Sequence, residues 1–522
     1  MKTVLISPYS QIESTGLRLL SACLKKEGYE TTMIFLPDVD EMLAETHFGG
    51  RRLPPETMQR IVDLCRDAQL VGITLMTAHF YMARYLTQEI KAQIDVPVLW
   101  GGVHPSMAPE QCLEYADLVC IGEGERMIVE LAHCIAEDRD YHHVGNLAYL
   151  DEVGKLVLNP LYPLDKNLDD LPFPDYDFEE QYVVNERKLV RFTISLMYFY
   201  LSDIGSWARG PVFGMIITRG CPYRCTYCVN DAFVLNAYPN WNRLRWRSPE
   251  NVMAEIQAIR KRLPEIEAIA IRDDTFLANP ERYITAFAKL YKEQVGLPFR
   301  AYTTPPAAKR EKIKSLVEAG MYMIIMGIES GAERIQEMYD RKFPNTMILQ
   351  AASVINEFKD QLSRPMYDLI TDNPYETAED QFETLQLINQ LPKPYKLSLF
   401  SLIFYPGTGL RDRAIEDGII TGEETDIYEN NFQMVQPTYF YFTLMCHSMN
   451  FPRPVLNLLA HRKMFDLFSK GVFNRFFGWV LYLVRRLRWR SNKHLYAERQ
   501  QRWLSEPVVE PPISHPPTLA HA

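Results

Sequence analysis

The sequence of 522 residues lacks any apolar run of the roughly 20 residues that a bilayer-spanning helix needs. Its first residues, MKTVLISPYS, contain neither a long apolar core nor a small-residue cleavage site, so they predict a β-strand rather than a signal peptide. We therefore expect a cytoplasmic protein. Positive charge is not in excess either, because the formal net charge is -10. That balance argues against nucleic acid as a partner and excludes no small-molecule substrate.

The sequence also has too few cysteines, nine in all, for a disulfide framework. Six of them are isolated, mostly in apolar segments, which is typical of buried free thiols in a reducing compartment. These six are Cys23, Cys65, Cys112, Cys120, Cys134 and Cys446. The other three, Cys221, Cys225 and Cys228, fall within eight residues and need a separate explanation.

Residues 1–145 alternate short apolar runs with helical patterns. Apolar strands that alternate with amphipathic helices predict a parallel sheet covered on both faces. We expect an α/β domain with a doubly wound, five-stranded parallel sheet, in which ligands bind beyond the carboxyl ends of the strands. The expected strands are residues 3–7, 31–36, 70–75, 96–100 and 118–121.

The remainder of the chain divides into four expected segments. Residues 146–205, with several prolines among aspartates, form a linker. Residues 206–410 contain six β/α repeats, which predict a partial (β/α)6 barrel with its chemistry at the carboxyl ends of the strands. Residues 411–505 form an α-rich carboxyl-terminal region, and the Pro-rich residues 506–522 form a disordered tail.

The segment RGCPYRCTYCVN follows the first strand of the second series directly. Its three thiolates, spaced C-x3-C-x2-C, can converge on an iron–sulfur cluster from one loop. A structural zinc site is the alternative, but it would need a fourth Cys or His at suitable spacing, and none is near in the sequence. Three protein ligands leave one iron of a 4Fe–4S cluster open for chemistry.

Cys221, Cys225, Tyr227 and Cys228 resemble the signature of radical S-adenosylmethionine (SAM) enzymes, in which an aromatic residue precedes the last cysteine. The resemblance implies that SAM chelates the open iron. It also implies that an electron from a flavodoxin- or ferredoxin-type donor cleaves SAM to a 5′-deoxyadenosyl radical, which abstracts hydrogen from a small-molecule substrate.

Further similar motifs lie at successive strand ends, where this family contacts SAM. They are IRDDTF, the arginine of the third strand, MGIESG, TDNPYET and FYPGTGL. Helix capping by the aspartates and a structural ion pair for Arg300 are the alternatives. The SAM-binding residues that the resemblance implies are Asp273, Asp274, Arg300, Gly327, Glu329, Ser330 and Asp372, together with Tyr227.

The first domain resembles the cobalamin-binding domain that often precedes this barrel, above all in GGVHPSMAPEQCLEYADLVCIGEGE. Simple tight turns, or a domain that has lost cobalamin, are the alternatives. The cobalamin contacts implied are Thr74, Thr77, Gly101, Gly102, Gly122, Glu123 and Gly124.

One feature departs from the cobalamin-dependent mutases and methionine synthase, which carry Asp-x-His-x-x-Gly after the first strand. The corresponding stretch here, SPYSQIESTG, has no histidine. We expect the lower face of cobalt to meet water or a non-coordinating side chain, and His104 to be a turn residue at the rim of the pocket. This pattern fits the methylase branch of the radical SAM enzymes.

The resemblance therefore implies an enzyme similar to class B radical SAM methyltransferases, which uses a 4Fe–4S cluster, SAM and cobalamin to methylate an unactivated carbon. A cobalamin-dependent cyclisation or rearrangement without methylation is the alternative within the family. A non-catalytic metal-binding scaffold is the alternative from another class, and it leaves the ordered strand-end motifs unexplained.

Residues 471–490 combine nine consecutive apolar residues, 476–484, with four arginines directly after them. Three interpretations remain: a helix lying in a membrane interface, a helix packed on the barrel with a solvated basic end, and an apolar lid over the substrate.

Overall fold

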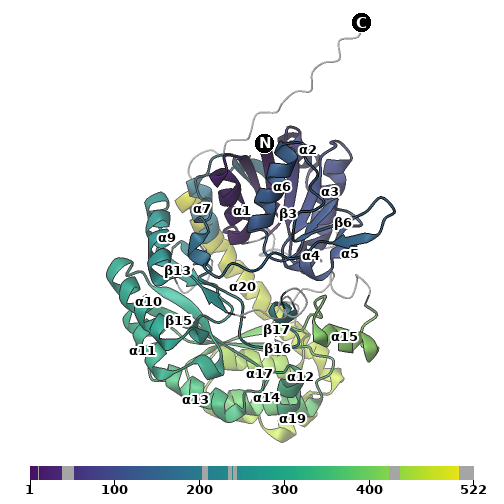
Figure 1. The fold of residues 1–522 in the computed structure, drawn as a ribbon. Coiled ribbons are helices and arrows are strands. Elements are labelled where there is room, and N and C mark those ends of the chain that lie inside the picture. The colour runs from purple at the N-terminus through teal and green to yellow at the C-terminus, as the bar shows by residue number, and fades with distance from the viewer. Residues whose placement is uncertain are drawn as a thin grey trace. The chain divides into compact units, whose positions relative to one another are not determined.

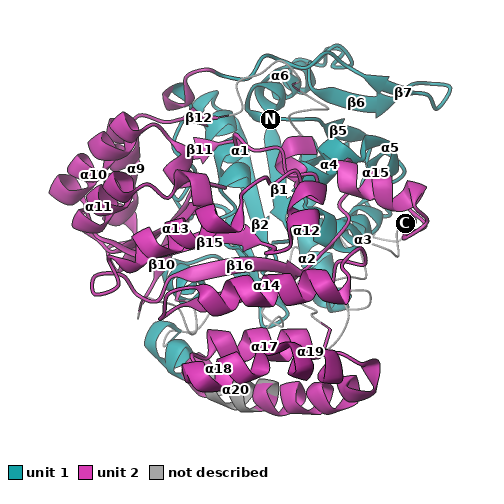
Figure 2. Ribbon diagram, turned by 90° about the horizontal axis from the view of Figure 1, so that it is seen from below, with its two compact units in different colours: residues 1–165, 170–201, 498–522 teal, residues 166–169, 202–497 magenta. Residues whose placement is uncertain are grey.

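The computed structural model describes residues 1–9, 11–37, 52–202, 208, 210–232, 238, 244–422 and 436–504. The expected disordered tail, residues 506–522, lies outside them. The chain forms two compact units (Figures 1 and 2). Unit 1 comprises residues 1–165, 170–201 and 498–522, and unit 2 comprises residues 166–169 and 202–497.

Unit 1 contains the five parallel strands expected from the sequence. Residues 3–7 of the first strand are all buried, so both faces of the sheet are covered. The strands are β1 (Lys2–Ser7), β2 (Glu30–Phe35), β3 (Leu70–Thr74), β4 (Val98–Gly101) and β5 (Leu118–Cys120), in the order β5-β4-β3-β1-β2. The helices between and after them are α1 (Thr15–Lys26), α2 (Pro55–Cys65), α3 (Phe80–Lys91) and α6 (Glu125–Ala136), with the short α4 (Val103–Met107) and α5 (Pro109–Cys112) after β4. The strand order reverses between β1 and β3, and ligands of such sheets bind at that point.

The stretch expected as a linker adds four further strands to this sheet. They are β6 (Leu147–Leu150), β7 (Leu156–Leu158), β8 (Gln181–Asn185) and β9 (Lys188–Arg191), which give a sheet of nine strands within the described residues. Residues up to 201, apart from 166–169, belong to unit 1.

Arg18 attaches that stretch to the body of unit 1. Its fully buried guanidinium donates to the carbonyl of Asp175 and to Oε1 of Gln181, both at 2.8 Å. It also lies 4.4 Å from the ring centroids of Phe35 and Tyr176. A buried cation satisfied by distant residues leaves no local sequence pattern, so the short strands on either side of the prolines were not anticipated.

Unit 2 contains the expected partial barrel, a six-stranded parallel sheet in sequential order. The strands are β10 (Val212–Met215), β13 (Ala268–Ile271), β14 (Phe299–Thr303), β15 (Met321–Glu329), β16 (Met366–Thr371) and β17 (Lys396–Ser401). The main helices between them are α9 (Pro249–Arg262), α10 (Glu281–Gln294), α11 (Arg310–Glu318), α12 (Glu333–Met338), α13 (Asn345–Asn356) and α14 (Ala378–Gln390). A small antiparallel pair, β11 (Thr218–Arg219) with β12 (Arg245–Trp246), follows β10 and precedes the second barrel strand.

The carboxyl-terminal part of unit 2 is helical, as expected. Its helices are α15 (Gly409–Glu416), α17 (Tyr439–Ser448), α18 (Arg453–Leu459), α19 (Arg462–Phe468) and α20 (Asn474–Trp503), whose end belongs to unit 1. In the described part of the chain, no helix is both long and apolar enough to cross a membrane.

Candidate functional site

The three clustered cysteines lie on one loop that begins directly after β11. The backbone turns tightly there, since the N–H of Cys228 donates to the carbonyl of Cys225 at 2.9 Å. Cys225 is buried, while Cys221 and Cys228 are partly exposed. Burial, with a smaller contribution from neighbouring acidic groups, raises the pKa of the Cys221 and Cys228 thiols to about 12.

Within the described residues, no three His, Cys, Asp or Glu side chains converge as they would around one metal ion. A four-iron cluster takes its thiolates from points farther apart than the ligands of a single ion. A loop that supplies three thiols is the pattern of a 4Fe–4S cluster with one open iron.

Arg341, which the sequence analysis did not single out, lies beside this loop. Its Nη1 is 3.5 Å from Sγ of Cys225 and 3.5 Å from the hydroxyl of Tyr227. Its Nη2 donates to the carbonyl of Gly327 at 2.6 Å and lies 3.7 Å from Oε1 of Glu329. Arg341 is buried, so it brings a permanent positive charge into the interior of the barrel. Its position after α12 shows no spacing signal that would have identified it.

Glu329 ends β15 in the left-handed region, with φ of 68°. A non-glycine residue is held there at a cost, and such strain clusters at functional sites. Burial raises the pKa of Glu329, and the charge of Arg341 opposes that rise. Gly327 is needed for this arrangement, because a Cβ on it would lie 2.3 Å from Oε1 of Glu329 and 2.9 Å from Nη2 of Arg341.

The two aspartates after β13 differ in their surroundings. Asp273 accepts a hydrogen bond from the N–H of Ile217 at 2.7 Å, which joins the ends of β13 and β10. Burial raises its pKa to about 7. The carboxylate of Asp274 acts electrostatically on Cys221 and Cys228, so Asp274 is the aspartate that faces the cysteine loop.

Asp368 is, after Arg341, a second residue of this site that the sequence did not reveal. It pairs in register with Gly327 and Ser398 on the neighbouring strands, and its side chain hydrogen-bonds Ser398. Burial, followed by the negative charge of Glu329, raises its pKa to about 8. Arg300 lowers the same pKa, so the arginine expected from the third strand acts on this group of acids. Alternating orientation along β16 places Asp368 on the face opposite its buried neighbours.

The other expected SAM contacts of unit 2 have local partners. Ser330 lies 3.2 Å from Oγ1 of Thr384 and accepts from the N–H of Ala332 at 3.2 Å, so its hydroxyl helps to hold α14. Asp372, with φ of 57°, accepts from Oγ of Ser401 at 2.8 Å. The ring of Tyr227 packs edge-on against Tyr339, with centroids 4.8 Å apart.

The expected cobalamin contacts lie together at the carboxyl ends of β3, β4 and β5. Oγ1 of Thr74 lies 3.0 Å from the hydroxyl of Tyr9, on the loop after β1. The N–H of Gly122 donates to Oγ of Ser106 at 3.0 Å. The carbonyl of Glu123 accepts from Asn146 at 3.1 Å, and Gly101 and Gly124 come close to Cys120.

Gly102 has φ of 107°, and a Cβ there would lie 2.8 Å from the carbonyl oxygen of Leu75. Only glycine fits this turn without strain.

His104 differs from its expected position at the rim of a pocket. It is fully buried in α4, with Nδ1 3.2 Å from Oγ1 of Thr77 and its ring edge-on to Phe80. A second histidine, His79, packs at a tilt against Tyr9, with ring centroids 5.0 Å apart and planes inclined by 51°. Burial lowers the pKa of His79 to about 4, and its buried Nδ1 has no partner among the described residues. Near the carboxyl ends of the strands of unit 1, His79 thus offers an imidazole nitrogen, Nδ1, that has no hydrogen-bond partner among the described residues.

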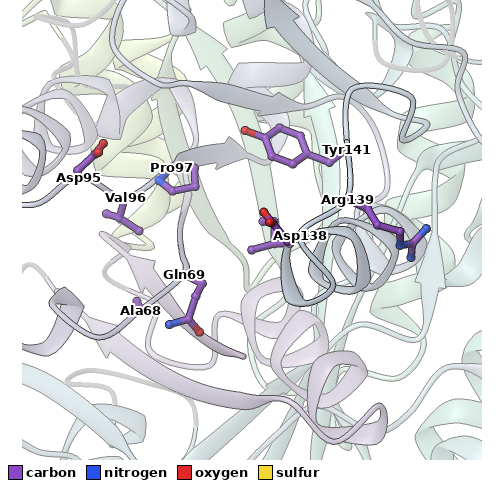
Figure 3. Close-up of a pocket in the computed structure, with 9 residues that line it drawn as sticks. Ala68, Gln69, Asp95, Val96, Pro97, Asp138, Arg139 and Tyr141 are labelled. Atoms are coloured by element: carbon purple, nitrogen blue, oxygen red, sulfur yellow. The ribbon is translucent and has the colours of Figure 1, made fainter.

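Figure 3 shows a pocket in unit 1 lined by Gln69, Pro97, Asp138 and Tyr141, among others. Gln69 and Pro97 directly precede β3 and β4, so this pocket lies at the amino ends of the strands. It is on the opposite edge of the sheet from the expected cobalamin contacts.

Comparison with known families and proteins agrees with the two folds. Residues 1–132 match the B12 binding domain, and residues 215–388 match the radical SAM superfamily. An uncharacterized methyltransferase of Pyrococcus horikoshii is 28% identical over 361 residues, which are 68% of this chain and 71% of that protein. The anaerobic magnesium-protoporphyrin IX monomethyl ester cyclase of Rubrivivax gelatinosus is 26% identical over 377 residues, 70% of this chain and 60% of that protein.

Among solved structures, the radical SAM methyltransferase TsrM of Kitasatospora setae, with cobalamin and a [4Fe-4S] cluster bound, superposes with a TM-score of 0.60. It is 18% identical, and the match covers 80% of this chain and 78% of TsrM. The cobalamin-dependent enzyme OxsB superposes with a TM-score of 0.58 at 17% identity, over 80% of this chain and 55% of OxsB. At these identities the likeness concerns the fold.

The barrel and its cysteine loop thus define a radical SAM enzyme, with a 4Fe–4S cluster and SAM as cofactors. More particularly, the chain belongs to the radical SAM enzymes that carry an amino-terminal B12-binding domain, and cobalamin is its third cofactor.

Proposed function

We propose that this enzyme transfers a methyl group from SAM to an unactivated carbon of a small-molecule substrate. The observation that carries the proposal is the buried guanidinium of Arg341 between Cys225 and Glu329, in a chain that also has a B12-binding domain. A buried cation beside a cluster ligand suits the carboxylate of a SAM molecule bound at the open iron.

Arg341 and three acids of the barrel interior then have places in SAM binding. Arg341 holds the SAM carboxylate in a charge-assisted pair, and Glu329 and Asp274 face its ammonium group. Asp368, protonated at neutral pH because burial raises its pKa, donates to or accepts from a ribose hydroxyl. Gly327 leaves the space in which these groups meet. Asp273, Ser330 and Asp372 position the strand ends through the partners described above.

The bound groups supply the reactive chemistry: the cluster delivers one electron to SAM, and cobalamin carries a methyl group. The chain binds and orients them, at the carboxyl strand ends of the barrel and of the first sheet. Thr74, Thr77, Gly101, Gly102, Gly122, Glu123 and Gly124 are the candidate cobalamin contacts. Glycines there let a broad, flat ligand approach the backbone. Either a flavodoxin- or a ferredoxin-type protein supplies the electron, and the six free cysteines outside the cluster loop favour a reducing, cytoplasmic location.

The product ratio tests the proposal. Cobalamin-dependent methylation consumes one SAM for the methyl group and one for the radical. Reduced enzyme with cobalamin and substrate should therefore form S-adenosylhomocysteine and 5′-deoxyadenosine in equal amounts. Deoxyadenosine without S-adenosylhomocysteine would instead support a cyclisation or rearrangement, a class of reaction named for the relative from Rubrivivax gelatinosus. Formation of neither product by enzyme with an intact cluster would contradict both.

A further inference from the structure

Helix α20 exposes a row of aromatic side chains although its other side is already packed. Phe476, Trp479 and Tyr482 are 55%, 58% and 48% exposed. On the opposite side Phe477 and Leu481 are buried, and the Phe477 ring lies within 5.5 Å of those of Tyr439 and Phe442 on α17. The exposed aromatics are therefore not needed to hold α20 in place.

One arginine continues the exposed row at each end. Arg475, Trp479, Tyr482 and Arg486 follow one another at intervals of four, three and four residues, and all four are exposed. This spacing places them on one face of a helix. Directly before the helix, Val472 is 79% exposed. We call Val472, Arg475, Phe476, Trp479, Tyr482 and Arg486 the α20 face.

The sequence around the α20 face is strongly basic, in contrast to the rest of the chain. Residues 449–497 contain ten Lys and Arg and one Asp or Glu, a net charge of 10 minus 1, or +9. Because the whole chain carries -10, the other residues together carry -19. A basic segment on an acidic protein is attracted to an anionic partner. The acidic remainder of the surface is repelled by the same partner, so the protein binds through the basic segment.

We infer that the α20 face docks the enzyme on an anionic lipid bilayer, with α20 lying in the headgroup region. Trp and Tyr favour that region because one part of each ring is apolar and another part is polar. Arginines at both ends can bury their stems and keep their guanidinium groups at the lipid phosphates. Figure 2 shows α17, α18, α19 and α20 next to one another, so α20 lies among other helices of unit 2. A second copy of this chain is a poor occupant, since a symmetric contact would bring two +9 segments together.

This inference goes beyond the proposed methyl transfer and does not depend on it. It explains why the apolar run 476–484 ends in arginines while the described helices contain no membrane span. The helix is packed on one side, against Tyr439 and Phe442 of α17, and presents an interfacial face on the other.

The test is sedimentation of the full-length protein with vesicles of phosphatidylcholine, with and without phosphatidylglycerol. We expect binding to the anionic vesicles, weakened by high salt. Trp479→Ser, and more strongly the triple change Phe476→Ser, Trp479→Ser, Tyr482→Ser, should lower the partition coefficient. Arg475→Gln with Arg486→Gln should lower it by roughly fivefold for each arginine. The control is Val153→Ser, which removes an apolar side chain in unit 1 that is 87% exposed, more than any apolar residue of the α20 face.

Because SAM cleavage by the variants reports on folding, it is measured in parallel without lipid. Two results would overturn the inference: wild-type protein that ignores anionic vesicles, or a triple variant that still binds them fully. The inference would also be overturned if the wild-type protein were a dimer without lipid and Trp479→Ser converted it to a monomer. The α20 face would then be an interface between two copies of the chain.

Discussion

Nη1 of Arg341 lies 3.5 Å from Sγ of Cys225, although 116 residues separate the two in the chain. The contact joins the loop after β11 to the segment after α12, and Glu329 lies on the other side of the same guanidinium. A charge that is always positive thus stands between a candidate cluster ligand and a buried carboxylate.

We expect Arg341→Gln to weaken SAM binding by about 10- to 150-fold, the effect of losing one charge-assisted hydrogen bond. Arg341→Lys should keep the charge but lose the planar, two-sided contact, so its affinity should be intermediate. Equilibrium binding of SAM to the reconstituted enzyme measures this. Arg310→Gln, a change at an exposed arginine, is the control. Unchanged affinity in both Arg341 variants would show that the SAM carboxylate binds elsewhere.

Replacement of Cys221, Cys225 and Cys228 together by alanine should abolish iron and sulfide binding, because one loop supplies all three thiolates. Iron and sulfide assays on anaerobically purified protein measure the result. Cys446→Ala serves as the control, since Cys446 is a buried free cysteine of the same unit. Full iron and sulfide content in the triple variant would rule out this loop as the cluster site.

Asp368 should make the apoprotein less stable as pH rises. Its pKa is about 8 in the folded protein against 3.8 ordinarily, so from pH 4 to 8 the unfolded chain binds fewer protons than the folded one. The free energy of unfolding should fall by up to about 1.4 kcal/mol for each pH unit in that window. Asp368→Asn keeps the shape of the side chain without the titration, so its denaturant midpoints should depend less on pH. Parallel pH profiles for the two proteins would contradict the raised pKa.

Replacement by alanine should have different effects on stability and cobalamin binding at Gly102 and at Gly101. Gly102→Ala forces a Cβ to within 2.8 Å of the Leu75 carbonyl at positive φ, so it should cost about 1–3 kcal/mol and weaken cobalamin binding. Gly101→Ala places its Cβ 3.5 Å from that of Cys120, an ordinary contact, and should be tolerated. Thermal unfolding and cobalamin titration separate the two effects. Normal cobalamin binding by Gly102→Ala would place the cofactor away from this turn.

Bound cob(II)alamin should give an electron paramagnetic resonance spectrum without nitrogen splitting from a protein ligand. The loop after β1 has no histidine, and His104 is buried against Thr77. His79, with its unpartnered Nδ1, is the imidazole that tests this expectation. The spectra of wild type and His79→Ala should be the same. Nitrogen splitting that disappears in His79→Ala would instead identify an axial ligand.

The short-range features of this protein could be read from its sequence. The cysteine spacing, the apolar strands and the glycine turns each depend on residues within about a dozen positions, where periodicity and turn chemistry act directly. The expected strands of both sheets, and the cysteine loop after a strand, are therefore present in the structure.

Contacts between distant segments were decided only by the tertiary structure. Arg341 reaches Cys225 from the segment after α12, where its guanidinium also donates to the carbonyl of Gly327 on β15. Asp368 lies beside Ser398 because β16 and β17 are parallel and in register, and its pKa responds to the charge of Glu329 on β15. The same holds for Arg18, whose buried guanidinium fixes a stretch 157 residues away. A charge can be buried only where distant partners surround it, and no local pattern of residues records which partners those are. The amino-acid sequence by itself determined the class of enzyme and the cluster loop, while the folded chain decided which charges stand around it.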